Sequence, residues 1–188
     1  MNQMIDIGGH PTWVDDRGAG DETVVLLHGG MSHSGLFLDV LGDALTDRYR
    51  VVSFDRRGCG RTADPGGPFH YADMATDTVD VLESVVHGRG HLVGWSDGGI
   101  IALLVALRRP DLIRRMVVIG TNVHHDAALP VDVDPNGPFF TMIRDDYAAL
   151  SPDGTEHFED LAERFGVMVT TEPTMTPGDL ALISVGRW

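Results

Sequence analysis

Short apolar runs that alternate with segments of helical periodicity constrain the fold of this chain more than any other feature. The runs TVVLL, RVVSF, HLVGW and RMVVI are rich in β-branched residues, as in strands that are buried on both faces. Between them, apolar residues recur at helical spacing over residues 36–45 and 74–86, and residues 98–107 are apolar on every side. This alternation predicts an α/β protein with a mostly parallel, twisted sheet and helices on both faces.

The two ends of the chain depart from this alternation. Residues 3–7 and 11–14 are interpreted as extended stretches that precede the first buried strand. Beyond Asn122 prolines interrupt the pattern, and short helical pieces replace it. In one of these pieces Phe158, Leu161 and Phe165 fall on a single helical face.

The pattern divides the chain into three parts. Residues 1–126 are the expected core, 127–173 an inserted helical or irregular cap, and 174–188 the start of a helix that returns to the core. In the last part Thr176 and Asp179 have the spacing of a capping box, and the proline between them suits the first helical position.

Composition limits the partners of the chain. A net charge of -14 argues against nucleic acid and anionic membranes, because both require clustered Lys and Arg. The single cysteine excludes an internal disulfide and suits a reducing compartment. No signal peptide is visible at the start, and the longest apolar run is too short to span a bilayer, so a cytoplasmic protein is expected.

Cofactor motifs are not expected either. The sequence contains no phosphate-binding loop of the G-x-x-x-x-G-K type. Its histidines and its cysteine lack the spacing of metal ligands. The sequence therefore predicts no metal and no cofactor, and a small molecule as the partner.

The stretch LVGWSDGGII carries the candidate chemistry. Ser96 lies between Gly94 and Gly98, after an apolar strand and before an apolar helix, which is the nucleophile-elbow pattern G-x-S-x-G. Small residues two positions away let the backbone turn sharply and present the hydroxyl at the N-terminus of the helix. The alternative is an ordinary turn serine, since short motifs of this kind also occur by chance.

The candidate oxyanion hole lies in two places. One donor is the backbone N–H of Asp97, the residue after the serine. The other is expected in the HGGMSHSG loop after TVVLL, with Gly30 preferred over Met31. The alternative interpretation of this loop is a plain turn that ends a strand.

Candidates for a catalytic base and for a second nucleophile are also present. Five histidines are considered as bases because they are expected near the sheet edge that carries Ser96 or in the cap: His28, His33, His124, His125 and His157. For each of them a solvated or core position is more common than a catalytic role. Asp126, Asp145 or Asp146 could orient the last of these. Cys59 could be a nucleophile activated by the neighbouring arginines, but its flanking glycines favour a tight turn that only a small side chain fits.

The motifs LLHGG, FDRRGCGRT and LVGWSDGG, in this order, resemble the α/β-hydrolase family over about residues 24–122. GWSDGG followed by IIALLVALRRPDLIRRMVV is similar to its valacyclovir-hydrolase (biphenyl hydrolase-like) branch. The resemblance implies a serine nucleophile at Ser96, oxyanion donors at Gly30 and Asp97, and structural roles for Arg56, Arg57 and Arg61. It also implies an acid and a histidine on strands beyond Trp188, so we expect a C-terminally incomplete hydrolase.

Two hypotheses follow. The first is a serine hydrolase that cleaves a small carboxylic ester, lactone or amide. The second is an inactive, truncated or degenerate relative that binds a ligand or partner, or is a fragment. Acidic residues of the cap could attract a cationic substrate group, or could simply be solvated: Asp132, Asp134, Asp145 and Asp146.

Overall fold

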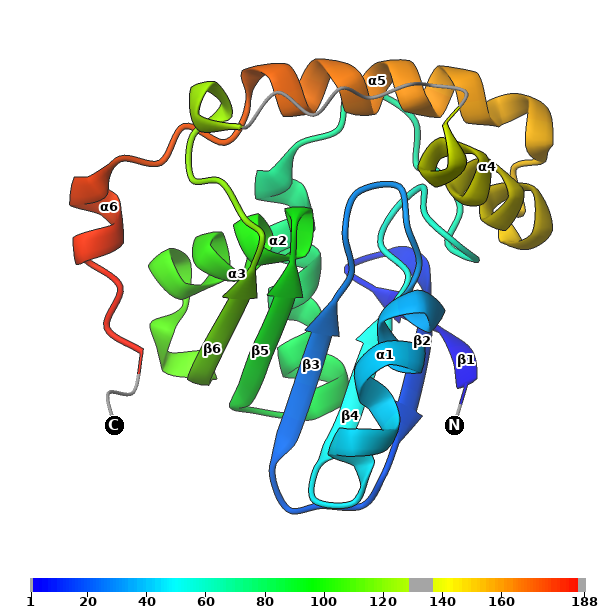
Figure 1. Cartoon of the computed structure of the whole chain (residues 1–188). Coiled ribbons are helices and arrows are strands. Elements are labelled where there is room, and N and C mark those ends of the chain that lie inside the picture. The colour runs from blue at the N-terminus through cyan, green and yellow to red at the C-terminus, as the bar shows by residue number, and fades with distance from the viewer. Residues whose placement is uncertain (1, 129–136, 186–188) are drawn as a thin grey trace.

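In the computed structural model, which describes residues 2–128 and 137–185, the apolar runs form a six-stranded sheet (Figure 1). Its strands lie in the order β1-β2-β4-β3-β5-β6 and are β1 (Asn2–Ile7), β2 (His10–Arg17), β3 (Thr23–Leu27), β4 (Arg50–Phe54), β5 (Gly90–Trp95) and β6 (Ile113–Ile119). The strands from β4 to β6 pair in parallel, whereas β1 and β2 form an antiparallel hairpin beside β4. The predicted mostly parallel sheet is confirmed.

Helices cover both faces of this sheet, as predicted. Figure 1 shows α1 (Ser34–Thr46) over β3 and β4 on one face, and α2 (Tyr71–Val81) and α3 (Asp97–Arg108) on the other. Successive side chains of a strand point to opposite faces, so Val24 and Leu26 pack with α1, whereas Val25 and Leu27 join the larger core around α2 and α3.

A left-handed residue ends the helical segment that begins with α2, and a proline follows the end of α3. A π-helical turn, Leu82–Val86, extends α2 to His87, whose φ of 61° closes the helix in the left-handed conformation. After α3, Pro110–Leu112 forms a single 3-10 turn, because proline cannot continue an α-helix.

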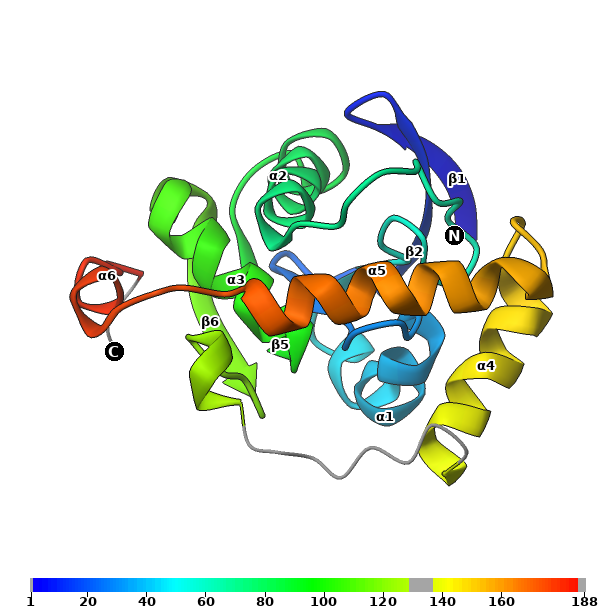
Figure 2. The same ribbon diagram turned by 90° about the horizontal axis from the view of Figure 1, so that it is seen from above.

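Helices follow β6 instead of further alternation. They are α4 (Pro138–Leu150), α5 (Phe158–Thr171) and α6 (Pro177–Ala181), with 3-10 turns at His125–Ala127 and Thr155–His157. Figure 2 shows α5 crossing above the carboxyl ends of the parallel strands. The predicted apolar face of α5 is buried, and the capping box between Thr176 and Asp179 is present. The division of the chain into core, cap and returning helix remains a prediction.

The edge strand β6 is the least covered part of the sheet. Among the described residues it pairs only with β5. Val117, Val118 and Ile119 are between 41% and 52% exposed, although their residue types suit a buried strand. None of the helices in the described ranges has the length and apolar character needed to cross a bilayer.

Asp64 joins the loop after β4 to the N-terminal part of α5. Its side chain is 3% exposed and accepts hydrogen bonds from Arg164 of α5 and, over 2.7 Å, from His157. Its own N–H donates to the Asp153 carboxylate over 2.8 Å. Burial alone would raise the pKa of Asp64, but the hydrogen bonds from Arg164 and His157 hold it at about 2.

We expect the substitution Asp64→Asn to lower the free energy of unfolding by about 2 kcal/mol at neutral pH, because a depressed carboxyl pKa stabilises the folded state. The difference from wild type should be full above the unfolded-state pKa near ~4 and should shrink as pH falls toward 2. Urea denaturation across this pH range measures it.

The matched control is Asp111→Asn, which removes an exposed ion pair with Arg109 and should change stability little. Equal effects of the two substitutions, or a difference that grows toward low pH, would contradict the anchoring role of Asp64.

Candidate active site

Ser96 occupies a strained turn between β5 and α3. Its φ of 53° and ψ of -121° lie in a region that residues with a side chain rarely adopt. The Ser96 N–H donates to the carbonyl of Ile119 over 2.8 Å, and its carbonyl accepts from the Thr121 hydroxyl over 3.1 Å. The turn is therefore held from β6 on both of its backbone groups, and the serine is half-buried at the carboxyl edge of the sheet.

The glycines around Ser96 are required by close backbone contacts. A Cβ on Gly94 would lie 2.3 Å from the carbonyl oxygen of Gly98, and one on Gly98 would lie 2.0 Å from that of Leu27. Both distances are far below van der Waals contact. The G-x-S-x-G spacing thus reflects the passage of the first turn of α3 directly against the ends of β3 and β5.

The two predicted sources of oxyanion donors lie side by side. A Cβ on Gly30 would come within 2.5 Å of the Asp97 carboxylate, so the loop after β3 touches the first residue of α3. Met31, the second candidate in this loop, has a left-handed φ of 52°. The oxyanion role of these residues remains a prediction.

Hydrogen bonds between Arg56, His28 and the Gly29 carbonyl fix the loop after β3. Arg56 is 1% exposed and donates to the Gly29 carbonyl over 2.6 Å and to the ring of His28. Burial, and then the positive charge of Arg56, lower the pKa of His28 well below its ordinary value. His28 is therefore a neutral, structural histidine, and Arg56 has the structural role that was predicted for it.

The other two predicted structural arginines also have carboxylate partners. Arg57 forms a bidentate pair with Asp77, at 2.7 Å for both bonds. Arg61 donates over 3.0 Å to Asp55, which is fully buried and also accepts the N–H of Ser34. The first pair joins the loop after β4 to α2, and Asp55 joins it to the N-terminus of α1.

The Asp97 side chain is a feature that sequence reasoning missed. It is buried, and its Oδ2 has no hydrogen-bond partner among the described residues. Burial raises the pKa of this carboxyl, while Arg56 and a hydrogen bond from Tyr71 oppose the rise. The signal in the sequence was an acidic residue directly after the serine, at a position whose neighbours are all apolar or glycine.

The remaining candidate bases have partners away from Ser96. His33 lies 3.4 Å from the Asp146 carboxylate, and His125 lies 3.2 Å from that of Asp126. His157 pairs with Asp64, so the expectation that Asp126, Asp145 or Asp146 would orient it is wrong, because α5 turns His157 toward the loop after β4. Within the described ranges, no histidine hydrogen-bonds to the Ser96 hydroxyl.

Cys59 is buried at 1% exposure, and burial raises the pKa of its thiol to about 12. A thiol with this pKa is protonated at neutral pH and is a poor nucleophile. Gly60 beside it has a φ of 53° and touches the Asp55 carboxylate, as expected of a tight turn. The geometry favours the structural interpretation of Cys59.

An apolar cavity of about 340 Å³ lies next to the strained turn. Trp95, which precedes Ser96, and Ile119 form one wall, and Phe37 of α1 forms another. The Ser32 hydroxyl borders the cavity and is buried without a hydrogen-bond partner among the described residues. The cavity can therefore take an apolar group and offers it one polar contact.

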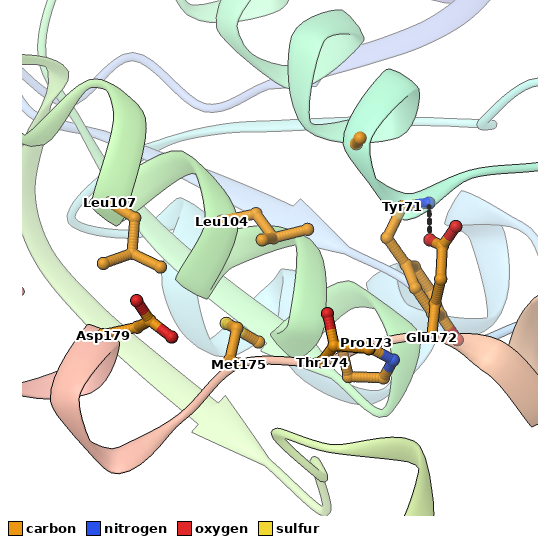
Figure 3. Close-up of a pocket in the computed structure, with 9 residues that line it drawn as sticks. Tyr71, Leu104, Leu107, Glu172, Pro173, Thr174, Met175 and Asp179 are labelled. Carbon is orange, nitrogen blue, oxygen red and sulfur yellow. Dashed lines mark hydrogen bonds between the residues drawn. The ribbon is translucent and has the colours of Figure 1, made fainter.

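A second cavity, of about 390 Å³, lies between α3 and residues 172–179 (Figure 3). Its two carboxylates are already engaged, since Glu172 accepts the Tyr71 N–H and Asp179 accepts the backbone and hydroxyl of Thr176. Ser96 does not line it. Ser96 is not among the lining residues of the first cavity either, but its neighbour Trp95 is, so the first cavity is the one adjacent to the Ser96 turn.

Comparison with known proteins agrees with this geometry. Residues 22–164 match the model of the α/β hydrolase fold family. The chain is 42% identical over 99 residues to RutD of Caulobacter segnis, named as a carbamate hydrolase, with 52% of the chain and 37% of that protein covered. It is 33% identical over 127 residues to the serine hydrolase BPHL of Homo sapiens, with 64% and 43% covered. The matched segment thus spans less than half the length of these relatives.

Solved structures show the same architecture. A serine hydrolase involved in carbazole degradation superposes with a TM-score of 0.76 over 98% of this chain and 76% of its own. At 20% identity this likeness concerns the fold alone. It agrees with the sheet order and with helices that cross the carboxyl edge of the strands.

We expect the substitution Gly98→Ala to destabilise the protein by about 2–3 kcal/mol, because the added methyl group overlaps the Leu27 carbonyl. The matched control is Gly166→Ala in α5, where an added Cβ meets nothing within 4 Å. That change should stabilise by about 0.5–1 kcal/mol through the helix propensity of alanine. Thermal unfolding compares the two, and a tolerated Gly98→Ala would show that α3 does not begin against β3.

Proposed function

Because the chain belongs to the α/β-hydrolase fold family, we propose that it acts as a serine hydrolase with Ser96 as its nucleophile. The observation that carries the proposal is the Ser96 turn, with its φ of 53° at the junction of β5 and α3. Such strain persists only where the surrounding structure enforces it, and it is concentrated at functional sites. Here contacts from β3 and β6 enforce it.

The reaction proceeds by acyl transfer. The Ser96 oxygen attacks the carbonyl carbon of the substrate while a base takes the hydroxyl proton. The negative charge on the carbonyl oxygen is stabilised by the N–H groups of Gly30 and Asp97. The alcohol or amine then leaves with the proton, and water hydrolyses the acyl-enzyme. Burial raises the pKa of the Asp97 carboxyl, whose side chain touches the loop that carries Gly30.

The proposed substrate is a small carboxylic ester, lactone or amide. The apolar cavity bounded by Trp95 and Phe37 suits an apolar acyl or alkyl group. A carbamate, as in the name of the Caulobacter relatives, presents a carbonyl to the same chemistry. Of the acidic cap residues considered for a cationic group, Asp132 and Asp134 lie outside the described residues, and Asp146 pairs with His33.

A second function is favoured by one observation, the lack of a histidine bonded to the Ser96 hydroxyl within residues 2–128 and 137–185. A serine hydroxyl is a weak nucleophile until a base removes its proton. In this alternative the 188-residue chain binds a carbonyl compound at the Ser96 turn but does not hydrolyse it.

A fluorophosphonate probe distinguishes the two functions. The proposal predicts that the folded chain is labelled stoichiometrically and that Ser96→Ala abolishes the labelling. Ser53→Ala is the control, since this buried serine hydrogen-bonds within the sheet. A folded sample that binds no label supports the second function, and labelling that survives in Ser96→Ala refutes Ser96 as the nucleophile.

The location of the base is tested by single substitutions. We expect His124→Asn, His125→Asn and His157→Asn each to leave the hydrolysis of a p-nitrophenyl ester nearly unchanged, because none of these rings, all among the described residues, hydrogen-bonds to the Ser96 hydroxyl. Initial rates at saturating substrate provide the measurement. A loss of about 100-fold or more in one variant would identify that histidine as the base.

A further inference from the structure

We infer that His124, His125 and Asp126, in the turn after β6, form a binding site for a first-row divalent transition metal such as Zn²⁺. One ligand atom from each residue lies within 4.8 Å of the other two. The inference is independent of the proposed function and differs from the sequence-based expectation of no metal site. Spacing along the sequence gave no signal for it, because three adjacent residues do not match a known ligand motif.

The distances suit a metal. The Nδ1 of His124 lies 3.6 Å from one Asp126 oxygen, and the Nδ1 of His125 lies 3.2 Å from the other. Ligands at about 2.0–2.2 Å from a tetrahedral Zn²⁺ are separated by about 3.4 Å. The Asp126 carboxylate is 78% exposed, so it is free of packing that would prevent it from turning toward an ion held by the two Nδ1 atoms.

The rings of the two histidines lie side by side. Their centroids are 4.5 Å apart, with an interplanar angle of 27°. The Nδ1 of His124 accepts the Asp126 N–H over 3.3 Å, so this nitrogen is unprotonated, and an ion bound there would take the place of that long hydrogen bond. Metal binding requires such an unprotonated nitrogen.

Hydrogen bonds to the segment that follows α5 fix the backbone of the turn that carries the site. The His125 N–H donates to the Pro173 carbonyl over 2.7 Å, and the Met175 N–H donates to the Val123 carbonyl over 2.9 Å. These bonds join the turn after β6 to the segment between α5 and α6, and this segment can be followed in Figures 1 and 2. Two of the three ligands are therefore held in place before an ion arrives, which lowers the cost of ordering them.

A second cluster of the same residue types shows why the assignment is specific. Asp64, His157 and Asp160 are equally close together, but Arg164 donates to both of these carboxylates. A guanidinium already supplies the positive charge there, so a metal would have to displace it. No arginine or lysine pairs with Asp126 among the described residues.

The ligand set indicates the class of metal. Two imidazole nitrogens and one carboxylate suit Zn²⁺, Co²⁺, Ni²⁺ and Cu²⁺, whereas Mg²⁺ and Ca²⁺ prefer oxygen ligands throughout. Three protein ligands leave a coordination position for water or for an anion of the solvent.

Isothermal titration of the full chain with Zn²⁺, and visible absorption with Co²⁺, test the site. We expect one saturable high-affinity site, which His125→Asn and His124→Asn each weaken by about 10-fold or more. His157→Asn, from the cluster that contains Arg164, should leave the affinity unchanged, and Mg²⁺ should not compete. Asp126→Asn changes the most exposed ligand, and it replaces the histidine variants as the test of the site if one of them fails to fold.

Three results would overturn the inference. They are the lack of saturable Zn²⁺ binding in the wild type, an unchanged affinity in both His124→Asn and His125→Asn, and an equal loss in His157→Asn. Circular dichroism of each variant confirms that it is folded before its affinity is compared.

Discussion

The contact between the Leu27 carbonyl and Gly98 is the constraint on which the candidate site depends. It brings the first turn of α3 against the end of β3 with no room for a side chain. The chain has one residue, Ser96, in which to turn from β5 into that helix, and the turn forces a positive φ. The same approach brings the loop after β3 to the side chain of Asp97, the residue after the serine. A single close packing of backbones thus sets both the position and the surroundings of the hydroxyl.

Buried charges hold the loops around this contact. Asp55 accepts the N–H of Ser34 and of Arg61, and Arg56 bonds to the Gly29 carbonyl and to His28. Each charge is matched by hydrogen bonds, which offsets the cost of removing it from water. Asp97 is the exception, since one of its oxygens has no partner in the described residues and its pKa is raised. The buried carboxyl of the site with the fewest hydrogen-bond partners is therefore adjacent to the proposed nucleophile.

Apolar and polar contacts together attach α5. Its buried face consists of Phe158, Leu161 and Phe165. Phe165 contacts Phe69 of the loop after β4, and Phe158 contacts Tyr147 of α4. Asp64 pairs with Arg164 near the middle of the helix. At its C-terminal end, the segment around Pro173 pairs with the turn that carries His124 and His125. Polar contacts thus fasten α5 at two points, and the proposed metal site lies at one of them.

The sequence by itself determined the layered α/β architecture, the apolar face of α5 and the capping box at Thr176, because each depends on periodicity or on neighbours within one turn. It also indicated the serine turn, since glycines at that spacing have few other uses. Only the tertiary structure decided which carboxylate pairs with His157, where the Asp97 side chain lies, and that three adjacent residues after β6 converge. These features join segments up to about a hundred residues apart, or depend on side-chain directions that a turn sets. Local pattern carries no information about such distances, because they are fixed only when the helices and loops pack on the sheet.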